Sequence, residues 1–206
     1  MITIYGGNNS RATRNLWVLE ELGVPYKQDK VNVEGRSKSP EYLAINPAGK
    51  VPSMSDENGD VAMFESLGIN LYLAQRYGVG KLWPIDAAGQ AKCIQWTMWT
   101  ACEVEGHAVG ILVEKVFKPA PARSEAVAKA CEEKLTPALK LLDSQLAGKT
   151  WLVGAGFTIA DLQAACVLSG LNMIKFDWSP YPHLAKWLGA CLVRDAHKKV
   201  AAMPRP

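Results

Sequence analysis

The sequence predicts an α/β domain over residues 1–78, followed by an all-helical domain over 87–206. Strand and helix patterns alternate in the first 78 residues. A segment rich in glycine and proline, "GVGKLWPIDAAG", then separates the two parts. Only long helical patterns follow that segment. The chain is therefore expected to change from mixed to helical architecture near residue 80.

The first three elements are predicted as strand, helix and strand. The apolar run "ITIY" at 2–5 is closed by two glycines, and an amphipathic pattern then covers 10–23. Gly23 is typical of a helix end, and Pro25 blocks continuation. The segment 26–33 is the second strand. A strand, helix and strand connected in this way indicate a parallel pair with a right-handed crossover.

A short helix and a hairpin come next. The helix is predicted over 39–46, where a proline stands in the first turn and another proline ends it. The runs 52–56 and 61–65 flank Asn58-Gly59, a pair that supplies the two positive φ angles of a tight hairpin turn. The resulting β-α-β-α-β-β-α order, completed by a helix over 66–78, matches a thioredoxin-like fold.

The second domain shows four helical patterns, which lie at 87–117, 123–147, 158–170 and 181–193. Pro137 falls inside the second pattern, so we expect a kink or a junction of two helices there. Thr158 and Asp161 have the spacing of a capping box. We therefore interpret Asp161 as a structural residue.

Composition excludes several function classes. The 206 residues carry 23 basic and 20 acidic side chains without a long run of one sign, so no nucleic-acid partner is expected. No apolar stretch reaches membrane-spanning length, and the N-terminus does not resemble a secretory signal. The five cysteines form no CxxC pair, which predicts reduced, mostly buried thiols, no disulfide and no metal site. We expect a cytoplasmic protein.

The dipeptide Val51-Pro52 suggests a peptide-binding edge. If its bond is cis, the N–H and C=O of Val51 stay unpaired at the edge of the sheet. Those groups can then pair with an extended peptide, as in strand addition. The alternative is that Pro52 simply begins an edge strand.

Glu65 and Ser66 stand where the second hairpin strand ends and a helix begins. The N-terminus of a helix attracts a carboxylate, which Ser66 can also bind, and Glu65 can pair with an ammonium group. Together these groups suit the head group of an amino acid. Alternatively, Ser66 is an N-cap and Glu65 an acid of the first turn.

The motifs, taken in order, resemble those of cytosolic glutathione transferases over nearly the whole chain. They are "NPAGKVPSM", "FES" followed by "IxxYLA", "LWP" with "QAKCIQW", and "WLVGAGFTIADL". The resemblance implies that glutathione is bound by Lys38, Lys50, Val51, Pro52, Glu65 and Ser66. In the family a cis proline lets the preceding backbone grip the cysteinyl unit, and the acid–serine pair holds the γ-glutamyl head. The two lysines are candidates for the glycine carboxylate or, equally, solvated surface residues.

The resemblance also implies that a hydroxyl in the loop after the first strand activates the glutathione thiol. Ser10 matches the serine-type pattern, whereas Tyr5 lies too early, within the strand. A hydroxyl and a helix N-terminus both favour the thiolate. Ser10 can instead be only an N-cap residue, and Asn8 or Asn9 can replace it as the donor.

The resemblance therefore implies a homodimeric detoxification enzyme that joins glutathione, as co-substrate and without a cofactor, to a small hydrophobic electrophile or peroxide. The electrophile pocket is expected beside the first helix of the second domain, where Trp96, Trp99, Glu103 and His107 recur at helical spacing. Such a stripe is more often part of a core or of a dimer contact than of a substrate pocket. Two alternatives are a non-catalytic glutathione-binding scaffold and a specialised dehalogenase or isomerase. A thiol–disulfide oxidoreductase is disfavoured, because no cysteine lies near the first helix.

Overall fold

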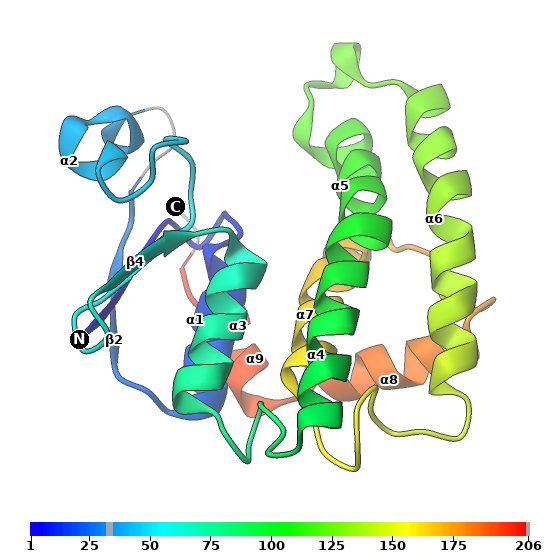
Figure 1. Cartoon of the computed structure of the whole chain (residues 1–206). Coiled ribbons are helices and arrows are strands. Elements are labelled where there is room, and N and C mark those ends of the chain that lie inside the picture. The colour runs from blue at the N-terminus through cyan, green and yellow to red at the C-terminus, as the bar shows by residue number, and fades with distance from the viewer. Residues whose placement is uncertain (32–34, 205–206) are drawn as a thin grey trace. The chain divides into compact units, whose positions relative to one another are not determined.

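The computed structural model describes residues 1–31 and 35–204, and the chain divides into two compact units. The first unit contains Met1–Trp83 together with the segment that begins at Arg194, and the second contains Pro84–Val193. Figure 1 shows the elements of both units along the chain. The division differs from the expected second domain over 87–206, because the segment after Arg194 belongs to the unit that holds the sheet.

The sheet of the first unit has four strands in the order β2-β1-β3-β4. Their bounds are β1 Ile2–Tyr5, β2 Tyr26–Asp29, β3 Ser53–Asp56 and β4 Val61–Phe64. Strand β1 pairs in parallel with β2, as predicted, and the other two pairs are antiparallel. The second strand ends at Asp29 rather than at 33, and predicted positions 32 and 33 lie outside the described residues.

Four α-helices complete the first unit, and they are α1 Ala12–Leu22, α2 Pro40–Leu43, α3 Ser66–Tyr77 and α9 Asp195–Ala201, with a 3-10 turn at Arg36–Lys38. Helix α1 packs against α3 and α9. It ends where Gly23 adopts φ 68°, as the sequence predicts. The core between helices and sheet consists of fully buried side chains, among them Ile2, Ile4, Leu16, Leu19, Met54, Ile69 and Leu73.

The β3–β4 hairpin differs from the predicted tight turn. Asp56 pairs with Val61, so four residues connect the strands, and the positive φ of 50° occurs at Asp60 rather than at Asn58 or Gly59. The loop is built around Asp56, whose Oδ1 accepts from the N–H of Asn58 and whose C=O accepts from the N–H of Gly59. These local hydrogen bonds favour a turn that begins at the aspartate.

The second unit is helical throughout its named elements. Its α-helices are α4 Ala87–Trp99, α5 Gly106–Leu112, α6 Glu125–Leu146, α7 Ile159–Leu168 and α8 Pro182–Leu192. Two π-helical segments, Thr100–Glu105 and Val113–Phe117, continue α4 and α5, so the pattern predicted over 87–117 is helical along its length. Short 3-10 helices lie at Ala120–Ala122 and Ser169–Ile174. Pro137 lies within α6, which is a single helix rather than two.

The capping box predicted at the start of α7 is present. The N–H and Oγ1 of Thr158 both donate to Asp161 Oδ2, at 2.9 and 3.0 Å. Asp161 Oδ1 accepts from the N–H of Leu152 and from Trp187 Nε1. Burial raises the pKa of the Asp161 carboxyl against the opposing effect of these hydrogen bonds. The side chain is fully enclosed and joins three segments of the helical unit, which fits its structural interpretation.

The cysteines are all free thiols, but only Cys93 and Cys191 are buried. The expectation that most are buried was wrong, because Cys102 is exposed and the other two are half-buried. Within residues 1–31 and 35–204, no helix is long and apolar enough to cross a bilayer. The same residues contain no cluster of three histidine, cysteine or acidic side chains arranged for a metal ion.

Candidate functional site

Gly6 brings two of the predicted site residues together. It follows β1 and adopts φ 141°, a conformation that side chains disfavour. A Cβ atom placed on Gly6 would lie 3.2 Å from Ser10 Oγ and 3.3 Å from Val51 Cβ. The same atom would lie 2.9 Å from Ala12 Cβ, at the start of α1. The absence of a side chain at this position therefore lets the Ser10 loop and the Val51 loop approach each other.

Ser10 is half-buried, and its hydroxyl is used within the loop. The hydroxyl donates to the C=O of Gly7 at 2.7 Å, and Oγ accepts from the N–H of Ala12 at 3.2 Å. The second bond satisfies one of the N–H groups that the first turn of a helix leaves unpaired. Ser10 thus has the capping contact that the sequence offered as an alternative. To reach a ligand, its hydroxyl must give up the bond to Gly7.

Asn8 is 4% exposed, and both the nitrogen and the oxygen of its side-chain amide make hydrogen bonds. Its Nδ2 donates to the C=O of Pro204 at 2.7 Å, and its Oδ1 accepts from Gln28 Nε2 at 2.7 Å. Gln28 Nε2 also donates to the C=O of Gly6. This arrangement weakens the alternative in which Asn8 donates to a ligand, whereas Asn9 is exposed. No sequence signal links Asn8 to a residue 196 positions away.

The Val51-Pro52 peptide bond is cis, as predicted. The preceding loop is held in place because the C=O of Lys50 accepts from Tyr42 Oη at 2.6 Å and from Asn46 Nδ2 at 2.7 Å. Neither the N–H nor the C=O of Val51 makes a hydrogen bond to another described residue. Both backbone groups are therefore open to pairing with a peptide.

Ser66 begins α3 and is buried beside α1. Arg14 Nη1 donates to Ser66 Oγ at 3.2 Å, and Asn15 Nδ2 donates to the Ser66 C=O at 2.8 Å. Since Oγ accepts from Arg14, the Ser66 hydroxyl hydrogen can be donated to another acceptor. The guanidinium, which is only 8% exposed, and the helix N-terminus both favour a negative charge here. The neighbouring Glu65 is exposed and has φ 73°.

The burial of Arg14 was not predicted, because arginines on a helix surface usually face solvent. Its partner Ser66 is 52 positions away, so no local pattern distinguishes Arg14 from the exposed Arg11. Only the packing of α1 against α3 brings the guanidinium of Arg14 to the Ser66 hydroxyl. The guanidinium adds a buried positive charge at the start of α3, where the sequence predicts that the carboxylate of a ligand binds.

The two candidate lysines are both exposed. Lys38 Nζ donates to the C=O of Gly49 at 2.6 Å, so it lies against the loop that leads to Val51. Lys50 is the residue directly before Val51. Both cations therefore stand near the open backbone, and the contacts do not distinguish between them.

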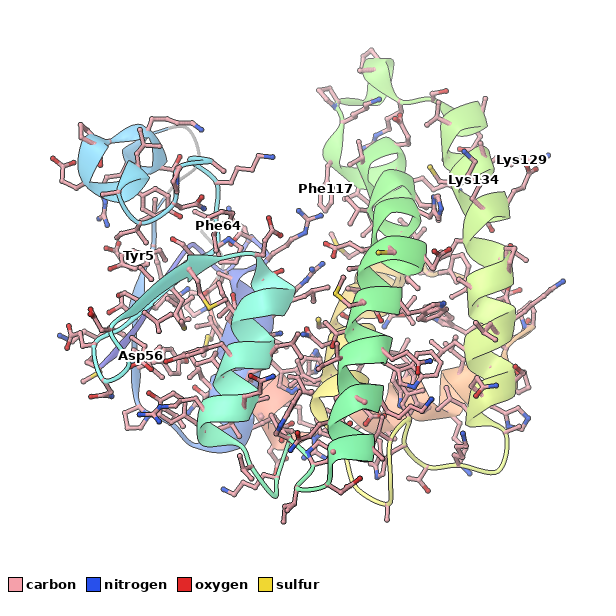
Figure 2. All side chains as sticks on the ribbon, viewed as in Figure 1. Tyr5, Asp56, Phe64, Phe117, Lys129 and Lys134 are labelled. Atoms are coloured by element: carbon pink, nitrogen blue, oxygen red, sulfur yellow. The ribbon has the colours of Figure 1, made fainter. Side chains whose placement is uncertain are left out.

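The remaining candidates lie apart from this cluster. Tyr5, labelled in Figure 2, hydrogen-bonds with Ser55 on the sheet, and its ring packs edge-on against Tyr42. It therefore takes no part in the Ser10 loop, as expected. In the helical unit, Trp96 is buried with its ring 5.1 Å from that of Trp99. This edge-on pair fits the alternative reading of the stripe as core packing.

Comparison with known proteins identifies related chains along the entire length. Residues 10–76 match the family model "Glutathione S-transferase, N-terminal domain", and residues 106–195 match "Glutathione S-transferase, C-terminal domain". Glutathione S-transferase GstB of Escherichia coli K12 is 34% identical over 206 residues, which cover 99% of each chain. Glutathione S-transferase 4 of Zea mays is 31% identical, with 97% of this chain and 92% of the maize protein covered.

Solved structures show the same architecture. The theta class glutathione S-transferase of Xanthomonas axonopodis pv. citri, determined with glutathione bound, superposes with a TM-score of 0.89 at 29% identity. The structure of glutathione S-transferase-I bound with lactoylglutathione has a TM-score of 0.88 at 28% identity. Each covers 98% of this chain, and this chain covers 98% of each.

Proposed function

This chain belongs to the glutathione S-transferase family, and we propose that the cluster formed by Ser10, Val51 and Ser66 binds glutathione and ionises its thiol. The protein is a glutathione transferase, as are its relatives. The observation that supports the site proposal is the close approach at Gly6, where Ser10 Oγ and Val51 Cβ lie 3.2 and 3.3 Å from the point that a Cβ would occupy. A thiol held by the Val51 backbone would lie within reach of a hydroxyl at the start of a helix.

The γ-glutamyl head of glutathione would bind at the start of α3. Its carboxylate would accept from the Ser66 hydroxyl and face the buried charge of Arg14, which contacts the same Oγ. A hydrogen bond to a carboxylate is stronger than one between neutral groups, which favours this orientation of the head. The α-ammonium would pair with the exposed carboxylate of Glu65.

The rest of the tripeptide would lie along the Val51 loop. The N–H and C=O of Val51 would pair with the cysteinyl unit as a one-residue strand, with Pro52 fixing the direction of the chain. The glycine carboxylate would then face Lys38 or Lys50. Such exposed ion pairs contribute about 0–1 kcal/mol each, so the backbone pairing and the buried head group dominate the affinity.

Ser10 would activate the thiol by donating a hydrogen bond to sulfur. The neutral bond from Ser10 to Gly7 would be replaced by a charge-assisted bond to the thiolate, which stabilises the ionised form. The thiol proton passes to solvent. The thiolate then forms a sulfur–carbon bond with the electrophile while the leaving group departs with its electron pair. With a peroxide, the thiolate sulfur attacks one oxygen and the O–O bond breaks, so that the other oxygen leaves with the electron pair and takes up a proton as alcohol or water. The glutathione sulfenic acid formed in this step then reacts with the thiol of a second glutathione to give the disulfide and water.

The compartment, the oligomeric state and the partners of the enzyme are inferred from its family and its composition. We propose that it acts in the cytoplasm as a homodimer on small hydrophobic electrophiles, in detoxification, without a membrane or nucleic-acid partner. The homodimer is proposed from the family membership, and Phe64 on β4, which is 41% exposed, would be available for an apolar contact (Figure 2).

The test is a titration of the thiolate ultraviolet absorbance of bound glutathione against pH. We expect the bound thiol to have a pKa well below that of free glutathione, and Ser10→Ala to raise that pKa and lower turnover at least tenfold. Ser55→Ala is the matched control, since it removes a hydroxyl from the sheet of the same unit. An unshifted thiol in the unmodified protein would refute activation at this site.

A second candidate is a protein that binds glutathione without ionising it. The observation that favours it is the use of the Ser10 hydroxyl within its own loop, where it contacts both Gly7 and Ala12. Binding with an ordinary thiol pKa would support this candidate. A specialised dehalogenase or isomerase would instead lower the thiol pKa and show narrow substrate preference in a screen of electrophiles.

A further inference from the structure

The loop that carries Ser10 is tied to residues near the other end of the described chain. Asn8 stands two positions before Ser10 and donates to the C=O of Pro204 at 2.7 Å. Gln28 Nε2 donates to Asn8 Oδ1 and to the C=O of Gly6. The loop is therefore fixed from both sides, by strand β2 and by the segment that follows α9.

That segment is itself anchored on α1 by charged groups. Arg194 donates to both oxygens of Glu21, at 2.6 and 2.7 Å, and the Glu21 side chain is only 8% exposed. Such a two-point contact fixes orientation as well as distance. One turn later Lys199 Nζ lies 2.6 Å from Glu20 Oε2.

An aromatic contact adds to this anchor. The ring of His197 lies 4.6 Å from that of the buried Trp17, which belongs to the helix that begins directly after the Ser10 loop. The segment 194–204 thus follows α1 from its last turn to its beginning, and it ends against Asn8.

We propose that the segment Arg194–Pro204 is a positioning element for thiol activation, which acts through Asn8 on the Ser10 loop. The inference rests on the proposed function, since it assumes that Ser10 serves the thiol. Asn8 is a positioning residue and does not touch glutathione. Its bond to Pro204 holds the backbone of the loop so that Ser10 Oγ stays beside Val51, the placement that Gly6 permits.

The physical reason is that thiol activation depends on position more steeply than binding does. A displacement of 1 Å in an active site can reduce the rate by about 100-fold. Most of the glutathione contacts proposed above come from Val51, Ser66 and Arg14, which the Pro204 bond does not reach. Loss of that bond should therefore reduce kcat and leave the affinity for glutathione nearly unchanged.

The experiment measures kcat, glutathione affinity and the pKa of the bound thiol in the full-length protein. We expect Asn8→Ala to lower kcat by about tenfold and to raise the thiol pKa, with glutathione affinity within about threefold. Arg194→Ala, whose side chain lies at the far end of the anchor, should act in the same direction by about threefold. Lys198→Ala is the matched control, because among the described residues the ion-pair partner of Lys198 is Asp195, which lies in α9 as well.

The double variant tests whether Arg194 acts on the Ser10 loop through Asn8. If the segment acts through Asn8, Asn8→Ala with Arg194→Ala should cost no more than Asn8→Ala alone. Additive losses would overturn the inference. So would an Asn8→Ala protein in which the melting temperature falls but kcat and the thiol pKa stay as in the unmodified enzyme, because that is what a purely structural role predicts.

A measurement without glutathione separates this inference from the proposed function. Hydrogen exchange of the Ser10 amide should become faster in Arg194→Ala and stay unchanged in Lys198→Ala. If the unmodified protein fails to ionise glutathione, the proposed function fails, yet the exchange result still decides whether the segment holds the loop. Unchanged exchange in Arg194→Ala would overturn the positioning role.

Discussion

Replacement of Gly6 by alanine should lower both the stability of the fold and the affinity of the proposed site for glutathione. The new Cβ would lie 2.9 Å from Ala12 Cβ, which belongs to the first turn of α1 and cannot move without the helix. It would also crowd Ser10 Oγ and Val51 Cβ, at 3.2 and 3.3 Å. The residue would in addition hold φ 141°, where side chains are disfavoured.

The magnitude follows from these two effects. Overpacking of a close contact typically costs about 1–3 kcal/mol. Backbone strain at φ 141°, which lies outside the left-handed helical region, adds about 1–3 kcal/mol. We therefore expect Gly6→Ala to lower the free energy of unfolding by about 2–6 kcal/mol. Glutathione affinity should fall as well, because the crowded atoms are those of the proposed thiol site.

The matched control is Gly23→Ala at the end of α1. Gly23 also has a positive φ, 68°, but a Cβ there would meet no atom within 4 Å. Its replacement should cost only the backbone strain of about 1 kcal/mol, without a change in glutathione affinity. Urea denaturation and equilibrium binding measure both quantities. Equal losses of stability in the two variants would refute the argument that Gly6 is required by close approach.

Two further predictions concern charged groups. Arg14→Met should weaken glutathione binding by about tenfold, since a charge-assisted hydrogen bond is worth about 1.5–3 kcal/mol. Arg11→Met is the control, because Arg11 is exposed, and it should leave the affinity unchanged. Calorimetric titration measures both affinities. Burial raises the pKa of Asp56, but hydrogen bonds from Tyr77 and Tyr72 outweigh it and hold that pKa below 3.8. Because the folded-state pKa is the lower one, this stabilisation is complete above the unfolded value and is lost as pH falls through the folded one. Urea unfolding between pH 6 and pH 2 should therefore show a steeper acid loss for the unmodified protein than for Asp56→Asn, and parallel curves would contradict the assignment.

Local chemistry explains why several elements could be predicted. Gly23 ends α1 because a left-handed residue suits a helix terminus, and Thr158 with Asp161 starts α7 because both cap groups lie within four residues. In each case the interacting groups are close in sequence, so the pattern contains the interaction. The cis bond before Pro52, by contrast, was implied by the family resemblance, because the dipeptide alone leaves cis and trans open.

Other features could not be predicted, because their partners are distant in the chain. The hairpin turn differs from an Asn-Gly turn because Asp56 organises the loop, and that aspartate is held by tyrosines of α3. Helix α9 was not predicted as part of the first unit. The charges of Arg194, just before α9, and of Lys199 within it look like those of a solvated surface until the fold brings them to Glu21 and Glu20.

The sequence by itself determined the two-part architecture and the succession of elements along the chain as far as β4, because hydrophobic periodicity and turn chemistry act over a few residues. The residues expected at a glutathione site came from the family resemblance and not from periodicity. Only the tertiary structure decided which polar groups are buried and paired. Arg14 reaches Ser66 because α1 packs on α3, and Asn8 meets Pro204 because the segment after α9 returns to the first unit. The contact of Arg14 with Ser66 spans 52 positions of the chain, and that of Asn8 with Pro204 spans 196. Such contacts depend on packing, which no local pattern specifies.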